Sequence, residues 1–139
     1  DEVNSLILRL PGIVGNKYKP RCWLNDIKNR LDQNKPINYF NPNNKFNNIF
    51  DIKNLVKFLE IIFKNKEIKK FDILNLGAKK PITINKLIKI SKEKRLSQSL
   101  LKKNDLKKNS FKIDIAKLIN KYKFNPDSTE KMLINFMNK

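Results

Sequence analysis

The sequence predicts an α/β fold, because short apolar runs alternate with amphipathic segments along its 139 residues. Two runs, 4–10 and 71–76, have the continuous apolar character of strands that are buried in a parallel sheet. The segments between and after these runs carry apolar residues at helical spacing. Two buried strands do not make a stable parallel sheet, so we expect this pair to be part of a larger one.

The first strand, Asn4–Leu10, is expected to end at Pro11-Gly12, and a loop is expected from Gly12 to Pro20. The elements expected next are a helix at Arg21–Asn34, strands at Ile37–Phe40 and Asn48–Ile52 around a turn at Asn41–Lys45, and a helix at Leu55–Lys64. Pro36 ends the first of these helices, because proline cannot continue the hydrogen-bond ladder. Asn54 is the expected N-cap of the second.

The second half begins with the strand Phe71–Leu76, which ends at Gly77. It continues with a turn at Lys79-Lys80-Pro81, a helix at about Ile84–Lys94 capped by Thr83 or Asn85, a lysine-rich loop or linker at 95–109, and a short helix at Ile113–Lys121. After Asn125-Pro126, the spacing of Asp127 and Glu130 is that of a capping box. The final helix then carries Met132, Leu133, Phe136 and Met137 on its apolar face.

The chain is strongly basic, with 31 Lys and Arg against 13 Asp and Glu and a net charge of +18. Taken directly, this charge predicts a polyanionic partner such as nucleic acid, a membrane surface or a phosphate-bearing ligand. Nucleic-acid sites favour arginine with interleaved aromatic residues, whereas this excess is nearly all lysine, spread along the chain together with asparagine and isoleucine. We therefore favour a compositional origin and keep a small basic nucleic-acid- or polyanion-binding module as the alternative.

The sequence excludes several kinds of chemistry. It has no histidine, and its single cysteine, Cys22, has no partner base, so Cys–His catalysis and Cys/His metal sites are ruled out. There is no Gly-x-Gly-x-x-Gly and no Walker loop, and the acidic residues are scattered. No catalytic residue and no metal site is predicted. With one cysteine, no visible secretory signal and no apolar run of the roughly 20 residues that span a bilayer, we expect a cytoplasmic protein without a membrane partner.

Several motifs together point to one family. Residues 8–15, Leu-Arg-Leu-Pro-Gly-Ile-Val-Gly, resemble the segment after the catalytic helix of the extended short-chain dehydrogenases/reductases, the nucleotide-sugar epimerase/dehydratase family, where a strand runs into Arg-x-Pro-x-x-x-Gly. Further matches follow in the family's order at Lys35-Pro36-Ile37, at residues 48–55, at Ile73–Gly77, at residues 81–87 and at Phe124-Asn125-Pro126. The resemblance covers this whole chain and only the C-terminal half of the family's chain.

The resemblance implies a single partial domain at 1–139: the last strands and helices of a Rossmann-type domain plus a small α/β substrate-binding lobe. The half with the Gly-rich dinucleotide loop and the catalytic Tyr-x-x-x-Lys pair would precede it, so we expect a truncated sequence or one piece of a split gene. The implied function is the substrate-binding half of an NAD(P)-dependent epimerase, dehydratase or reductase, inactive alone. NAD or NADP would be bound mainly by the missing half, the substrate would be a nucleotide-sugar, and a homodimer of the full-length protein is left open. The other reading is a nonfunctional fragment, unstable because its sheet lacks neighbours.

The resemblance assigns Pro11, Gly12, Ile13 and Val14 to a backbone turn along the nicotinamide end of the cofactor. The chemistry is consistent, because glycine lets the backbone approach a ligand closely and ligands of open α/β sheets lie beyond the carboxyl ends of the strands. The alternative is a tight turn with no ligand contact.

The residues considered for substrate binding are Lys17, Arg21, Trp23, Lys45 and Asn47. The family often has an arginine at the place of Asn47, in contact with the diphosphate; asparagine carries no charge, so Lys45 is expected to substitute. The alternatives are that Trp23 packs in the core beside Leu24 and Ile27 and that the basic residues are solvated. A structural role is favoured for Asp51, Asn54, Asn75 and Gly77.

Overall fold

The computed structural model describes residues 5–15, 22–65, 71–104 and 112–138 and confirms the α/β class. In chain order the elements are β1 (Leu6–Arg9), β2 (Gly12–Val14), α1 (Trp23–Asp32), β3 (Ile37–Phe40), β4 (Lys45–Phe46), β5 (Ile49–Asp51), α2 (Ile52–Asn65), β6 (Asp72–Asn75), β7 (Ile82–Thr83), α3 (Ile84–Lys94), β8 (Leu101–Asn104), α4 (Ala116–Asn120) and α5 (Thr129–Met137). Across these ranges, no helix is both long and apolar enough to cross a membrane.

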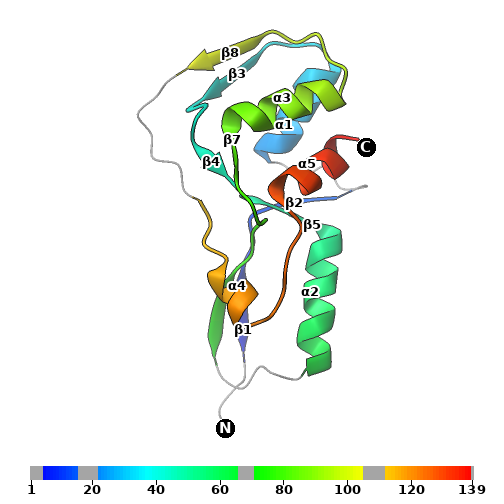
Figure 1. Ribbon diagram of the computed structural model, residues 1–139. Coiled ribbons are helices and arrows are strands. Elements are labelled where there is room, and N and C mark those ends of the chain that lie inside the picture. Colours follow the sequence, from blue (N-terminus) through cyan, green and yellow to red (C-terminus); the bar gives the residue numbers. More distant parts are fainter. Residues whose placement is uncertain (1–4, 16–21, 66–70, 105–111, 139) are drawn as a thin grey trace.

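The strands form four separate pairs (Figure 1). β1 lies parallel to β6, from Leu6 opposite Asp72 to Arg9 opposite Asn75, and this confirms the pair of parallel strands that the sequence predicts. β2 is parallel to β5 and β3 to β8, whereas β4 and β7 are antiparallel. The β1–β6 pair and α4 lie at one end of the elongated molecule, and β3, β8, α1 and α3 lie at the other (Figure 1).

The core joins the two ends through α5, which packs against α3 and β5. All four apolar residues that the sequence assigned to this helix are buried, and so are Ile49 and Phe50 of β5. At the β1–β6 end, Phe58 of α2 is buried, and its ring lies 5.4 Å from the ring of Phe124. Apolar burial of this kind is the main stabilising contribution to a domain of this size.

Two strands occupy segments that the sequence assigned to loops. β2 lies inside the loop expected from Gly12 to Pro20, because its backbone pairs with the fully buried strand β5. β8 lies inside the loop or linker expected at 95–109, where its exposed lysines concealed a backbone that pairs with β3. Residues 16–20 and 105–109 of those expected loops fall outside the described ranges. Both segments form strands because each pairs with a strand far away in the chain. Local sequence patterns do not reveal such partners.

The predicted N-cap residue is the observed one at α3, and a different residue caps α2 and α5. Thr83 caps α3 as expected, with its hydroxyl accepting from the Lys86 N–H. At α2 the expected cap Asn54 is wrong: the helix starts at Ile52, and the Asp51 carboxylate accepts from the Asn54 N–H at 2.8 Å. At α5 the cap is Ser128 and not Asp127. In both cases the helix begins at a different residue from the one that the motif indicated, and a neighbouring side chain accepts the free N–H.

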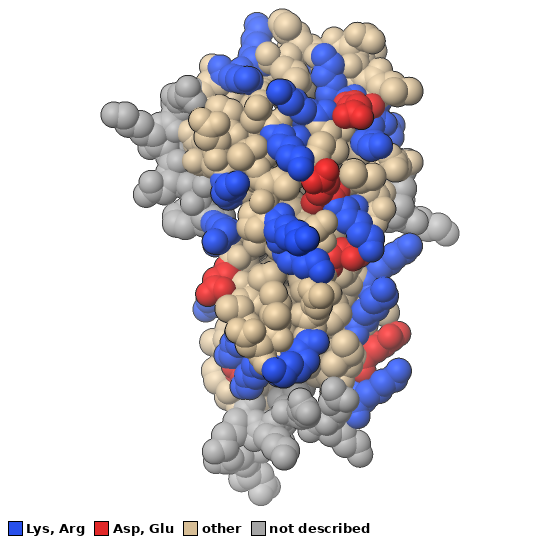
Figure 2. All heavy atoms as spheres, viewed as in Figure 1, with Lys and Arg blue, Asp and Glu red and all other residues tan. Residues whose placement is uncertain are grey.

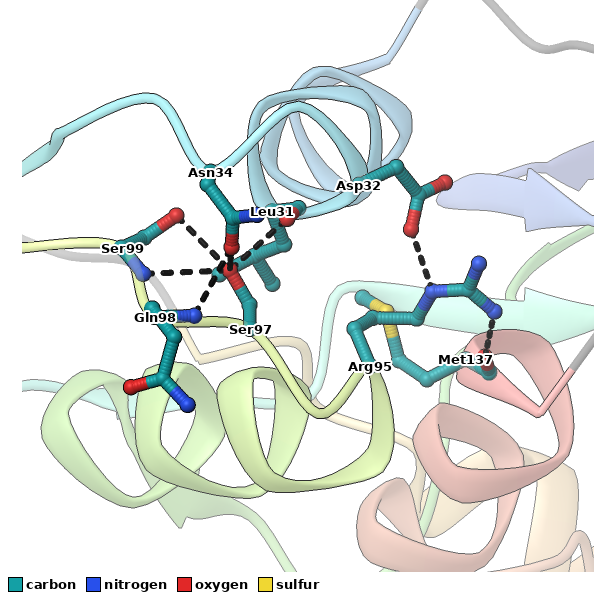
Figure 3. Close-up of polar contacts among 8 residues, drawn as sticks. All are labelled: Leu31, Asp32, Asn34, Arg95, Ser97, Gln98, Ser99 and Met137. Atoms are coloured by element: carbon teal, nitrogen blue, oxygen red, sulfur yellow. Dashed lines mark hydrogen bonds and ion pairs between the residues drawn. The ribbon is translucent and has the colours of Figure 1, made fainter.

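A polar cluster closes the end of the molecule that holds α1 and α3 (Figure 3). The buried Ser97 hydroxyl lies 2.7 Å from the Leu31 carbonyl oxygen near the end of α1 and 2.8 Å from the Ser99 hydroxyl. Arg95 donates to the Asp32 carboxylate at 2.5 Å and to the Met137 carbonyl oxygen at 2.7 Å. The carboxyl ends of α1, α3 and α5 are therefore held together by hydrogen bonds as well as by apolar packing.

Candidate functional site

The turn after β1 carries the chain from one strand pair to another. Leu10 and Pro11 lie between β1, which pairs with β6, and β2, which pairs with β5. The Gly12 N–H donates to the Asn48 side-chain oxygen at 3.3 Å, and a Cβ at Gly12 would lie 3.2 Å from the Asn48 backbone oxygen. The close approach of two backbones therefore favours glycine at this position.

The end of β6 lies beside this turn. Because β1 and β6 are parallel, both strands finish at the same end of the pair, and the Leu76 N–H donates to the Arg9 carbonyl oxygen at 3.0 Å. Residues 77–80 thus follow β6 at the same end as residues 10–12 follow β1. In open α/β sheets this is the end where ligands bind.

Asn47 connects the end of β6 with the segment before α4. Its side chain is 1% exposed, and the amide group donates to the Ala78 carbonyl oxygen at 3.1 Å and to the Ile113 carbonyl oxygen at 2.9 Å. The amide oxygen accepts from the Ile113 N–H at 2.8 Å. Both amide hydrogens and the amide oxygen of Asn47 are thus bonded to the protein backbone.

A cavity of about 540 Å³ lies next to Asn47, beyond the end of β6. This volume is within the usual range for small-molecule sites. The residues that line it with Asn47 are of two kinds: the charged Lys79, Lys80, Lys112 and Asp114, and the apolar Ala78, Pro81, Ile113, Ile115 and Ile119. The cavity is therefore lined by three lysines and one aspartate together with apolar side chains.

The three lysines that line the cavity differ in their surroundings. Lys79 donates from its ammonium group to the Asn125 side chain at 2.9 Å, and its backbone is bonded to Asp127 and Thr129. Lys80 and Lys112 are exposed, and neither forms an ion pair or side-chain hydrogen bond with any residue in the described ranges. Among the described residues, two of the three ammonium groups thus have no partner.

No family model and no curated protein matches the sequence. Solved structures do match the fold. UDP-glucose 4-epimerase from Thermotoga maritima with UDP-glucose is 17% identical at a TM-score of 0.69, over 95% of this chain and 44% of that chain. UDP-glucuronic acid 4-epimerase from Bacillus cereus in complex with NAD is 20% identical, with a TM-score of 0.70 and the same shares of the two chains. dTDP-glucose 4,6-dehydratase from Bacillus anthracis in complex with NAD is 10% identical, with a TM-score of 0.72, over 95% of this chain and 43% of that chain.

This chain has the fold of the C-terminal portion of nucleotide-sugar epimerases and dehydratases. The fold that the motif resemblance implied is confirmed. The chain spans less than half the length of these epimerases and dehydratases. In such a portion, the turn after β1 and the cavity after β6 lie where a larger Rossmann-type sheet would place its ligands.

Three of the four residues of the expected cofactor turn form the strand β2, and Pro11 precedes it. Pro11, Gly12 and Ile13 are half-buried, whereas the Val14 side chain is 1% exposed and belongs to the core. Contact of this turn with a nicotinamide stays a prediction. Within the described ranges, no group of three metal-binding side chains is found.

The expected substrate residues are not all brought together. Lys17 and Arg21 lie outside the described residues. Trp23 is 41% exposed at the start of α1, with its ring 5.7 Å from that of Phe46, while Leu24 and Ile27 of the same helix are buried. Lys45 is exposed on β4 and does not line the cavity beside Asn47.

The structure adds cationic residues that sequence reasoning missed. The sequence predicts Lys79 and Lys80 only as part of a turn, although a basic turn directly after a buried strand is also a signal for an anion site. Lys112 carried no signal, because its approach to the cavity depends on the bonds between Asn47 and Ile113, 66 positions apart.

Proposed function

We propose that the chain is the substrate-binding half of an NAD(P)-dependent nucleotide-sugar epimerase, dehydratase or reductase. The observation that carries this proposal is the cavity lined by three lysines and by apolar side chains, located at the same end of the β1–β6 pair as the Pro11-Gly12 turn. A nucleotide-sugar likewise combines a charged diphosphate with less polar base and sugar groups. The fold likeness to epimerases supports the same assignment.

Pro11 and the strand β2 that follows it would form one wall of the cofactor site. Glycine at position 12 fits this role, since it keeps a side chain away from a backbone that already approaches Asn48 closely. The bound nicotinamide would exchange a hydride with a sugar carbon. The chain contains neither a Gly-x-Gly-x-x-Gly nor a Tyr-x-x-x-Lys sequence, so we propose that a further segment supplies dinucleotide binding and proton transfer.

The β1–β6 pair offers a surface for that further segment. Only β6 pairs with β1 among the described strands, so one edge of β1 has no strand beside it. Ile7 on β1 is 47% exposed, Leu10 is 52% exposed and Phe71 before β6 is 62% exposed. We propose that the remaining strands of a Rossmann-type sheet cover these residues.

The half-buried free cysteine Cys22 fits a reducing compartment, and we propose a cytoplasmic location. Figure 2 shows basic side chains spread over the visible face with acidic ones among them, and this distribution does not single out a nucleic-acid surface. We therefore propose no separate polyanion-binding site on this face.

Tryptophan fluorescence tests the substrate assignment, because Trp23 is the only tryptophan and packs on Phe46, the neighbour of Asn47. We expect saturable quenching by UDP-glucose and none by free glucose. A Trp23→Phe variant controls for optical artefacts, and absorbance of NADPH or NADH should show no turnover. Absence of UDP-glucose binding by the folded chain, or clear turnover by the chain alone, would contradict the proposal.

A further inference from the structure

We propose that Lys80 and Lys112 bind the diphosphate of a nucleoside diphosphate group in the cavity, and that Asn47 is a positioning residue that holds the segment carrying Lys112. This inference rests on the proposed function and deepens it. It assigns the anion contacts to residues outside every motif that the sequence offered.

The Asn47 side chain is hydrogen-bonded to backbone groups of the protein. Its amide already makes three hydrogen bonds, to Ala78 and Ile113, at 2.8 to 3.1 Å, and its side chain is 1% exposed. Donation of a hydrogen bond to a phosphate oxygen would require breaking one of the two bonds that the amide hydrogens make, which leaves a buried carbonyl group unsatisfied. The residue therefore acts on a ligand through the segment that it holds.

That segment brings Lys112 to the cavity. Ile113, the next residue, is bonded through both its N–H and its carbonyl oxygen to Asn47, and Ile113 and Ile115 lie in the cavity wall. The contact at Gly77 is tight, since a Cβ there would lie 3.2 Å from the Cγ2 atoms of both isoleucines. The backbone next to Lys112 is thus fixed while its ammonium group is exposed.

Lys80 reaches the cavity from the other segment. Its backbone has a φ of 52°, in the left-handed region, directly after Lys79, which is bonded to Asp127, Thr129 and Asn125. Lys79 is therefore held by hydrogen bonds within the protein, as Asn47 is. The exposed Lys80 ammonium has no ion pair in the described part of the chain. Two point charges from separate segments suit the several oxygens of a diphosphate.

The apolar residues that line the cavity favour a ligand with apolar groups beside its charge. Pro81, Ile115 and Ile119 border the same cavity as the two lysines, and Ile119 is 38% exposed. A free inorganic anion would gain nothing from these side chains, whereas a base or ribose would cover them. The chemistry therefore favours a nucleoside diphosphate group over phosphate or pyrophosphate alone.

The test is isothermal titration calorimetry of the 139-residue chain at low salt with uridine diphosphate, inorganic pyrophosphate and uridine as separate probes. We expect uridine diphosphate to bind more tightly than either fragment. Lys80→Gln and Lys112→Gln should each weaken its binding about tenfold, the value of one charge-assisted hydrogen bond. The control is Lys89→Gln with Lys92→Gln on α3, which removes two charges elsewhere and should leave binding within about twofold.

A double-mutant cycle tests the role of Asn47. If Asn47 positions Lys112, Asn47→Ser should weaken binding, and Lys112→Gln should then add little, while Lys80→Gln keeps its effect. Additive effects of Asn47→Ser and Lys112→Gln would contradict this coupling. The lysine variants, which change only exposed side chains, decide the anion site even if Asn47→Ser fails to fold.

The outcomes separate this inference from the proposed function. Binding of uridine diphosphate that neither lysine variant alters, or that only Lys45→Gln weakens, would overturn the inference and leave the proposed function standing. Failure of the folded chain to bind both uridine diphosphate and UDP-glucose would overturn both.

Discussion

The side chain of Asn54, in the first turn of α2, holds the backbone of Asp127, 73 residues later in the chain. Its amide oxygen accepts from the Asp127 N–H at 2.9 Å. Its amide nitrogen lies 2.7 Å from an Asp51 carboxylate oxygen and 3.2 Å from one of Asp127. A neutral donor thus lies between two carboxylates and ties the segment before α5 to the start of α2.

Asn54→Asp should destabilise the chain by about 3 kcal/mol at pH 7, because a third carboxylate would replace the donor in a buried site. Repulsion from the two neighbouring carboxylates would raise the pKa of the introduced carboxyl group above its unfolded value. The deficit relative to wild type should therefore be large at neutral pH and shrink as the pH falls toward about 4. Urea unfolding of Asn54→Asp and wild type at pH 7 and at about pH 4 measures this deficit.

Asn38→Asp is the matched control for this change, because Asn38 is exposed on β3. Its unfolding free energy should stay within about 0.5 kcal/mol of wild type at pH 7. Equal deficits for the two variants would contradict the assignment of Asn54 as a buried link.

Asp72, at the start of β6, should make stability depend on pH in acid. Hydrogen bonds from Lys117, then Lys121 and Tyr122, hold the pKa of this carboxyl well below its usual range. Because the folded pKa is lowered, the stabilisation is present above the unfolded value of about 4 and is lost as the pH falls below it. Asp72→Asn should cost about 2 kcal/mol at pH 7.

The comparison of Asp72→Asn with wild type between pH 7 and pH 2 checks this prediction, since the two unfolding curves should converge in acid. Glu93→Gln, at an exposed position on α3, removes the same charge and should change stability by less than about 0.5 kcal/mol. A constant difference between Asp72→Asn and wild type over the whole pH range would show that the ionised carboxylate is not the stabilising group.

The sequence predicted the elements whose own apolar pattern defines them. α3 and α5 bury the residues that their spacing indicated, and the parallel pairing of β1 and β6 follows from two continuous apolar runs. β8 has a burial pattern that is mostly exposed, so nothing in its composition indicates a strand, and its pairing with β3 is decided by residues some 60 positions away.

In the candidate site, too, local features could be predicted from the sequence and contacts between distant segments could not. Gly12 could be singled out from the sequence, because Pro-Gly directly after an apolar run marks the end of a strand. What favours glycine there, the close approach of the Asn48 backbone, is not local. The commitment of Asn47 to Ala78 and Ile113 could not be predicted, since a family motif gives the residue at a position but not the partners that the fold gives it. The expected substitution of Lys45 for the family's arginine also assumed proximity, and Lys45 does not border the cavity.

The outer face of β1 should contribute little to the stability of this chain. Ile7 is 47% exposed, whereas Leu74 on β6 is 1% exposed. Ile7→Thr keeps a β-branched residue in the strand and should cost less than about 1 kcal/mol, while Leu74→Ala should cost about 3 kcal/mol through lost burial and a cavity. Equilibrium urea unfolding compares the two. A cost of Ile7→Thr that matches that of Leu74→Ala would show that this face is already covered, and so would not be free for further strands.

Ser97 should be the residue of the Figure 3 cluster that contributes most to stability. Its hydroxyl is buried, lies 2.7 Å from the Leu31 carbonyl oxygen, and bonds to both the hydroxyl and the N–H of the buried Ser99. Ser97→Ala would remove the bond that each of these two Ser99 groups makes. We expect a loss of about 2 kcal/mol. Gln98→Ala is the control, because only the backbone N–H of Gln98 bonds to Asn34 and that bond survives the substitution. Trp23 fluorescence during urea unfolding follows α1, the helix that Ser97 holds. If Ser97→Ala and Gln98→Ala unfold at the same urea concentration, the cluster adds nothing to the apolar packing of the three helix ends.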